Sequence, residues 1–144
     1  MNLIKNVKLV RHSNAVAAGA TVITPSAGID CANFERCTFV AAFGAIVAGA
    51  ATSVEVHESD DDSSYAALAG SKVTVADSDD NKLVYVEIVK PLKRYLKMVV
   101  NRATQNATLD GIVAILSGPG KAPTIQDSTV LGGEVHVSPI AGTA

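Results

Sequence analysis

The chain contains no tryptophan, and aromatic residues make up only 4% of its 144 residues. Proteins that bind sugars or nucleic-acid bases commonly use exposed aromatic rings as stacking platforms, so this scarcity disfavours both kinds of ligand. Charged residues are also few, at 18%, and the formal net charge is −2. A protein that binds a phosphate backbone normally carries a clear excess of positive charge. We therefore expect no nucleic-acid partner.

Long hydrophobic runs are missing as well. The longest, Val40 to Ala51, is interrupted by Gly44 and Gly49 and is shorter than the roughly 20 residues that a membrane-spanning helix needs. The first residues lack the apolar core of a signal peptide, so we expect no membrane partner and a reducing compartment. In such a compartment Cys31 and Cys37 are expected to remain free thiols.

Motifs for catalysis or metal binding are absent from the sequence. The three histidines, His12, His57 and His136, are scattered singly, without the spacing of a metal site. The acidic runs at residues 60–62 and 77–80 lack the spacing of a calcium-binding EF-hand loop and are typical of turns between strands. No serine lies in the GxSxG pattern of a hydrolase nucleophile. We expect no enzymatic activity and no cofactor.

What the sequence does contain is a period of two, the pattern of strands whose side chains alternate between two faces. Alternation predicts a strand from Lys82 to Lys90 and another from Arg94 to Arg102, joined as a hairpin around Pro91. Their inward faces predict six core residues: Val84, Val86, Ile88, Leu96, Met98 and Val100. Only Tyr65 to Ala69 favours a helical turn.

Further short strands separated by turn residues predict an all-β fold, a β-sandwich or jelly roll. These strands are expected at residues 7–11, 21–24, 34–43, 53–58, 72–76, 111–116 and 134–137. Cys37 is expected on the core face of its strand. We expect one sandwich domain over residues 1–118 and an extended segment over residues 119–144, which packs on its own domain or on a neighbour.

High apolar content favours association. The mean hydropathy is +0.28, which leaves little polar material to cover a free monomer, and we expect a homo-oligomer, a trimer first and a dimer second. Two groups of residues are candidates for partner contacts. The first is a cationic group around a predicted turn, made of Lys90, Lys93, Arg94 and Lys97. The second consists of apolar residues in the extended segment, Leu131, Val135 and Val137.

The order of elements carries a resemblance. An acidic loop with Glu58-Ser59-Asp60-Asp61 follows one strand, and Lys93-Arg94-Tyr95-Leu96 opens a later one. Over Phe34 to Gly118 this order resembles the head decoration, or cement, proteins of tailed bacteriophages. The resemblance implies a non-enzymatic virion protein that is assembled in the host cytoplasm. Such a protein binds the major capsid protein on the outside of the capsid and stabilises it by bridging capsomers.

An alternative of another class is a β-sandwich module that binds a host surface or a carbohydrate. The lack of tryptophan counts against it. For a decoration protein, docking is expected to depend on an extended end of the chain, Met1 to Asn6 or Ala122 to Ala144. The cations near Lys93 and Arg94 would assist.

Overall fold

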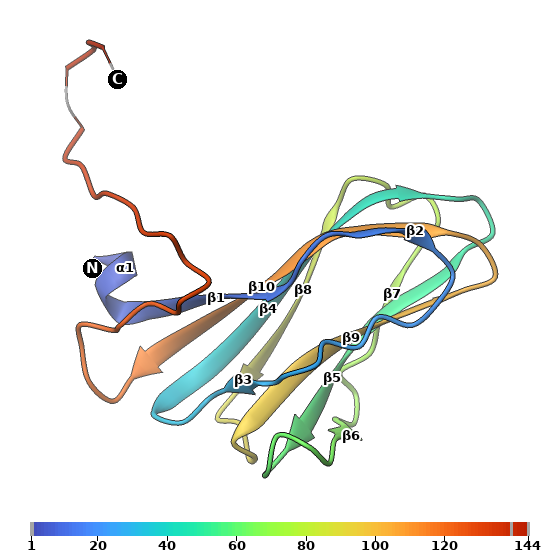
Figure 1. Ribbon diagram of the computed structural model, residues 1–144, viewed down its shortest axis with the longest axis horizontal. Helices are drawn as coiled ribbons and strands as arrows, with labels where there is room; N and C mark the ends of the chain where they lie inside the picture. Colours follow the sequence, from blue (N-terminus) through green and yellow to red (C-terminus); the bar gives the residue numbers. More distant parts are fainter. Residues whose placement is uncertain (1, 139, 144) are drawn as a thin grey trace.

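The computed structural model describes residues 2–138 and 140–143 and forms a β-sandwich of two antiparallel sheets (Figure 1). The first sheet has the strand order β1-β10-β4-β8, with β2 also beside β10, and the second has the order β3-β9-β5-β6, with β7 also beside β5. The first sheet comprises β1 (Val7–Ser13), β2 (Val16–Gly19), β4 (Phe34–Ile46), β8 (Leu83–Val89) and β10 (Ala107–Pro119). The second comprises β3 (Ile29–Asp30), β5 (Ala51–Ser59), β6 (Ala66–Ala67), β7 (Val73–Val75) and β9 (Tyr95–Ala103). The predicted all-β sandwich is confirmed.

The core lies between the two sheets and is built by alternation. Leu96, Met98 and Val100 of β9 are completely buried. Val84, Val86 and Ile88 of β8 are half-buried and pack against the same cluster. All six predicted core residues therefore face the interior, although β8 covers its side of the core incompletely. Cys37 is also fully buried, as predicted.

The predicted hairpin between residues 82–90 and 94–102 is wrong. β8 pairs with β4 in the first sheet, whereas β9 pairs with β5 and β3 in the second. The link between them therefore crosses from one sheet to the other, and Lys90 at its start has a positive φ of 52°. Alternation shows which face of a strand is buried, but it is the same whether the next strand lies beside it or across the sandwich.

Three further local expectations fail. Residues 65–69 form no helical turn but contain β6, which pairs with His57 and Glu58 of β5. Residues 134–137 form no strand, and residues 21–24 contribute only a bridge between Ile23 and Val100. The short helix is instead α1 (Leu3–Asn6), where the Asn2 side chain accepts a hydrogen bond from the Lys5 N–H. In the described residues no helix has the length and apolarity to cross a membrane.

Candidate interaction surfaces

Two members of the cationic group expected around the β8–β9 link, Lys93 and Arg94, have their charge compensated by nearby carboxylates. Arg94 donates two hydrogen bonds to the carboxylate of Asp30, with N···O distances of 3.0 and 2.8 Å. Lys93 lies 3.8 Å from the carboxylate of Asp60. Exposed pairs of this kind contribute little to stability, but they reduce the positive charge that a partner would meet.

Lys97 does not belong to the surface at all, and its place in an exposed cationic group is wrong. The loop between β5 and β6 covers it, and its ammonium nitrogen lies 3.7 Å from the centre of the Tyr65 ring. Tyr65 in turn donates a hydrogen bond from its hydroxyl to Asp62, which also accepts from the Gly28 N–H at 2.7 Å. The hydrogen bond from Tyr65 lowers the pKa of Asp62, and burial raises the pKa of Tyr65. These contacts fix the loop over the second sheet.

The histidines lie apart from one another. His12 is half-buried, and its Nε2 atom accepts a hydrogen bond from the Met98 N–H at 3.1 Å. Burial, together with the charge of Lys97, lowers the pKa of His12 to about 4. His57 contacts Glu55, two residues away on the same strand, at 2.9 Å. Among residues 2–138 and 140–143, no three His, Cys, Asp or Glu side chains converge in a group that could hold a metal ion.

Carboxylates of both acidic runs accept hydrogen bonds from backbone N–H groups. Asp61 accepts hydrogen bonds from the backbone N–H groups of Ser63 and Ser64, at 3.0 and 2.8 Å. In the second run, Asp80 accepts from the Ile46 N–H at 2.5 Å. These carboxylates therefore hold turns between strands, which is the interpretation that the sequence favoured.

The chain after β10 divides into two parts. Residues 124–129 lie along the outer edge of β1, where the Gln126 side chain accepts from the Leu9 N–H at 2.8 Å and donates to the Val7 carbonyl at 2.8 Å. The hydroxyl of Thr129 accepts from the Arg11 N–H at 2.9 Å. This part of the chain satisfies backbone groups at the β1 edge that would otherwise have only water as a partner.

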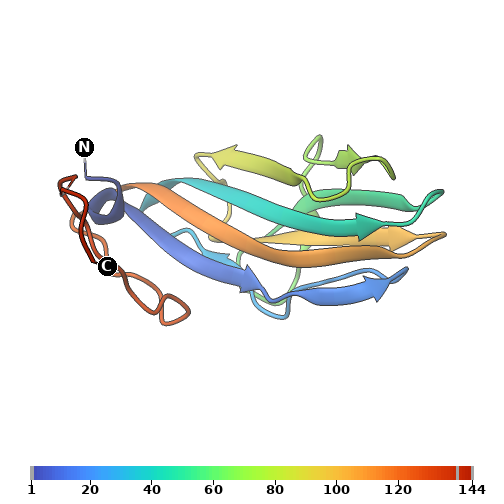
Figure 2. The ribbon, with the colours of Figure 1, turned by 90° about the horizontal axis from the view of Figure 1, so that it is seen from above.

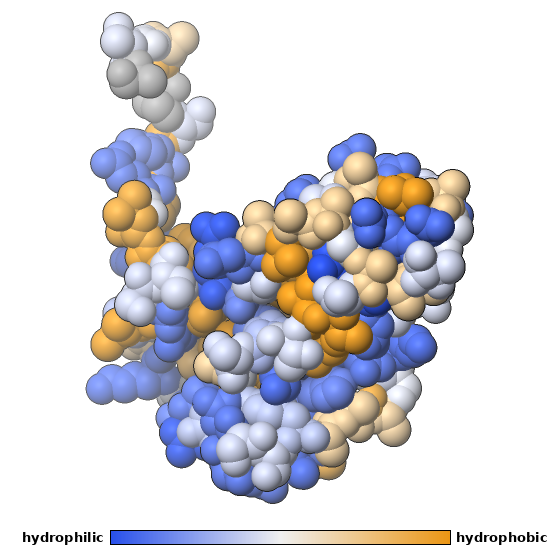
Figure 3. Space-filling model, turned by 45° about the vertical axis from the view of Figure 1, so that its right-hand side comes forward, coloured by the Kyte–Doolittle hydropathy of each residue, from blue (hydrophilic) through white to orange (hydrophobic). Residues whose placement is uncertain are grey.

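Residues 131–138 and 140–143, called the C-terminal arm below, project away from the sandwich (Figure 1). The side chains of Leu131, Val137 and Ile140 are at least 95% exposed, and Val135 is 66% exposed. Hydrophobic residues are visible along the arm in Figure 3. No hydrogen bond joins the backbone of residues 131–138 or 140–143 to the body of the protein. The sequence-predicted contacts Leu131, Val135 and Val137 thus lie together on this arm, where Val135 also borders a pocket lined by Ile4 and Leu9.

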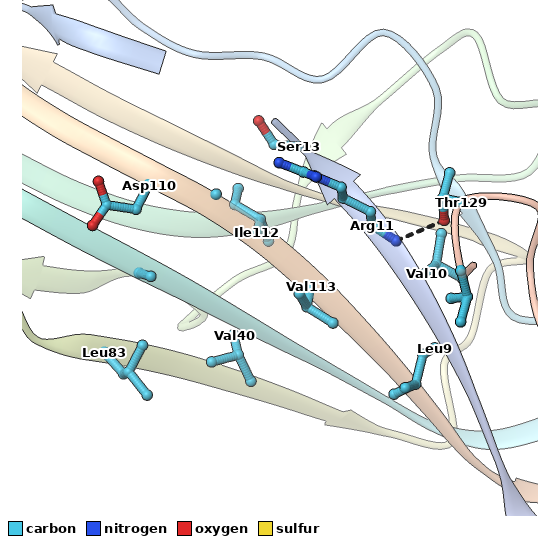
Figure 4. Close-up of a pocket in the computed structure, with 13 residues that line it drawn as sticks. Leu9, Val10, Arg11, Ser13, Val40, Leu83, Asp110, Ile112, Val113 and Thr129 are labelled. Atoms are coloured by element: carbon cyan, nitrogen blue, oxygen red, sulfur yellow. Dashed lines mark hydrogen bonds between the residues drawn. The ribbon is translucent and has the colours of Figure 1, made fainter. Parts of the chain in front are cut away.

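A second apolar surface occupies the outer face of the first sheet, and the sequence reasoning missed it. A shallow groove there is lined by side chains of four strands, including Leu9, Val40, Leu83 and Val113 (Figure 4). Val113 and Leu83 are 42% and 70% exposed. The sequence does contain a signal for this surface, the nearly continuous apolar run through residues 39–43. A strand with one solvated face alternates between apolar and polar residues, whereas such a run makes both faces of the strand apolar.

The chain matches no known family model and no curated protein sequence. Among solved structures, it is similar to a chain from work entitled "Bacillus endospore appendages form a novel family of disulfide-linked pili", at 9% identity, with a TM-score of 0.46, over 78% of this chain and 88% of that one. It is also similar to a chain of infectious bursal disease virus, strain Gx, at 16% identity, with a TM-score of 0.38. That match covers 81% of this chain and 34% of the viral one. Similarity at this distance assigns no function to the present chain.

Proposed function

We propose that the protein is a non-enzymatic structural subunit of a tailed-phage virion. It binds the major capsid protein on the outside of the capsid and stabilises the capsid by bridging capsomers. The observation that carries this assignment is the C-terminal arm, where Leu131, Val137 and Ile140 are at least 95% exposed. The resemblance over Phe34 to Gly118 to phage decoration proteins supports the same assignment.

The exposed apolar side chains of the arm gain free energy when a partner buries them. Transfer of a Leu, Val or Ile side chain from water to an apolar contact contributes roughly 1.5 to 3 kcal/mol. Ordering the backbone costs about 1 to 2 kcal/mol for each residue. Docking therefore costs the arm conformational entropy. Side-chain burial and main-chain hydrogen bonds to a neighbouring strand offset this cost.

The two candidate docking groups differ in their response to salt. Contacts of the arm are apolar or between main chains, so they persist as ionic strength rises. Ion pairs through Lys93 and Arg94 weaken once screening acts over about 8 Å, at physiological ionic strength and above. Because both cations already have carboxylate partners at 3.8 and 2.8 Å, we assign them the minor part. The groove on the first sheet gives the capsid protein a second apolar contact area.

The test is co-sedimentation with phage capsids that lack the protein, at low and high salt. A full-length variant with Leu131→Ser, Val135→Ser and Val137→Ser replaces three apolar side chains of the arm by polar ones and leaves the core unchanged. Its binding is expected to fall at least tenfold, while the wild type still binds in about 0.5 M salt. Leu92→Ser is the matched control, because Leu92 is 93% exposed but lies on the link between β8 and β9.

Two outcomes would contradict this assignment. If the arm variant binds like the wild type and Lys93→Glu with Arg94→Glu abolishes binding, docking is ionic and the arm has no part in it. If the wild type binds no capsid but is retained on a glycan array, the protein is a carbohydrate-binding module instead.

A further inference from the structure

The free edge of β8 is a binding surface that the capsid assignment does not use. Within residues 2–138 and 140–143, β4 is the only strand paired with β8. The Lys90 N–H bonds to the Glu35 carbonyl at 2.6 Å, and the Phe43 N–H bonds to the Lys82 carbonyl at 3.1 Å. Since hydrogen-bonded residues alternate along an antiparallel ladder, the even-numbered residues of β8 point their backbone groups at β4.

The odd-numbered residues of β8 therefore point their N–H and C=O groups away from the sheet. These residues are Leu83, Tyr85, Glu87 and Val89, and no hydrogen bond from the described residues reaches their backbone. An edge strand of seven residues without proline is a template for another strand. Figure 2 shows the C-terminal segment at the opposite side of the sheet, near β1, so it leaves this edge uncovered.

The side chains of β8 are also incompletely covered. On the outer face Leu83 and Tyr85 are each 70% exposed and Val89 is 48% exposed. On the inner face Val84, Val86 and Ile88 are only half-buried, although they belong to the core. A strand added at this edge would bury residues on both faces at once.

We propose that β8 pairs antiparallel with β8 of a second copy, about a two-fold axis at Val86. The two five-stranded sheets then become one continuous sheet. Around this axis Leu83 lies opposite Val89 of the partner copy, and Tyr85 lies opposite Glu87. On the inner face Val84 lies opposite Ile88. Each Leu, Val or Ile of the strand thus meets another aliphatic residue, Tyr85 meets Glu87, and all outward N–H and C=O groups of the strand are paired.

The charge on Glu87 selects this register. A shift of the axis by one residue to Glu87 would place the two Glu87 carboxylates directly opposite one another, which is destabilising. A shift to Tyr85 would place Glu87 opposite Leu83. With the axis at Val86, each Glu87 keeps its contact with Arg36 of its own chain, at 3.5 Å, and meets a tyrosine across the interface. The interface is isologous and closes as a dimer.

Proline at position 87 tests the pairing. The Glu87 N–H points outward, so Glu87→Pro removes one hydrogen bond from each copy, two for the dimer, but none of the β4–β8 ladder. By light scattering at micromolar concentration, we expect two chains for the wild type and one for this variant. Glu87→Gln keeps the N–H and is the matched control, expected to remain a dimer. A wild type that is monomeric at this concentration would overturn the proposal.

Cysteine substitutions test the register independently of any effect of proline on folding. Residues 84, 86 and 88 occupy the close pairs of the new ladder, with Cα atoms about 4.5 Å apart, which suits a disulfide. Val86→Cys is expected to cross-link to itself under mild oxidation, whereas Val84→Cys and Ile88→Cys alone are not. An equimolar mixture of Val84→Cys and Ile88→Cys is expected to cross-link. Dimers without this pattern would show that another surface joins the copies.

Discussion

Arg102 provides the sharpest test of what holds the two sheets together. It lies in β9 and is only 4% exposed, so its guanidinium is charged within the interior. It donates hydrogen bonds to the carbonyls of Ala17, Thr21 and Ala107, at 2.9, 2.9 and 2.7 Å. One side chain of the second sheet thereby binds β2, the chain that follows β2, and the start of β10.

The perturbation is Arg102→Met, which keeps a long apolar side chain and removes the donors. A hydrogen bond to a charged group contributes roughly 1.5 to 3 kcal/mol, and the carbonyl of Ala107 is left buried without this donor. Part of the loss is returned, because the charged guanidinium no longer has to be removed from water. We expect a net loss of about 3 kcal/mol in the free energy of unfolding, a large share of the stability of a small domain.

The assay is urea unfolding followed by far-UV circular dichroism. With a slope of about 1 to 3 kcal/mol per molar urea, the midpoint should fall by about 1 to 3 M while the slope is unchanged. The matched control is Arg94→Met, because Arg94 is exposed and bonded to Asp30, and it should change the midpoint far less. If the two variants unfold at the same urea concentration, the contacts of Arg102 do not stabilise the fold.

Three shorter predictions concern the interior. Gly28→Ala should lower the unfolding midpoint, because a Cβ atom there would lie 2.0 Å from the Tyr65 hydroxyl, and it should free Lys97 for acetylation in a labelling assay. Because the pKa of His12 is lowered from 6.5 to about 4, the unfolded chain binds the proton more tightly than the folded protein. The free energy of unfolding should therefore fall by about 3 kcal/mol as the pH drops from 6.5 to 4. The His12→Gln variant should lack this part of the pH dependence. The pKa of the Cys37 thiol is raised by its contact with Cys31 and by burial, so the thiol should resist a disulfide reagent in the native protein and react in urea; fast native labelling would contradict this.

Alternation in the sequence was sufficient to predict the class of fold and the inward face of most strands, because burial imposes the period of two directly. Leu96, Met98 and Val100 illustrate this. Pairing between strands depends on long-range contacts that alternation does not encode, so the hairpin after residue 90 was predicted in one sheet when the strands lie in two. The burial of Arg102 was equally inaccessible, because its partners are backbone carbonyls, which every residue carries.

The two edges of the first sheet show how this chain treats exposed backbone. At β1, the side chains of Thr124, Gln126 and Thr129 supply donors and acceptors to the edge, so the chain closes this edge with its own residues. At β8, the edge carries exposed Leu83 and Tyr85 and receives no such cover from the described residues. A strand edge that is both apolar and unpaired invites aggregation unless a specific partner occupies it. Within the described residues, the chain covers its β1 edge with residues 124–129 and leaves its β8 edge uncovered. We take this difference to favour a protein partner, rather than water, at the β8 edge.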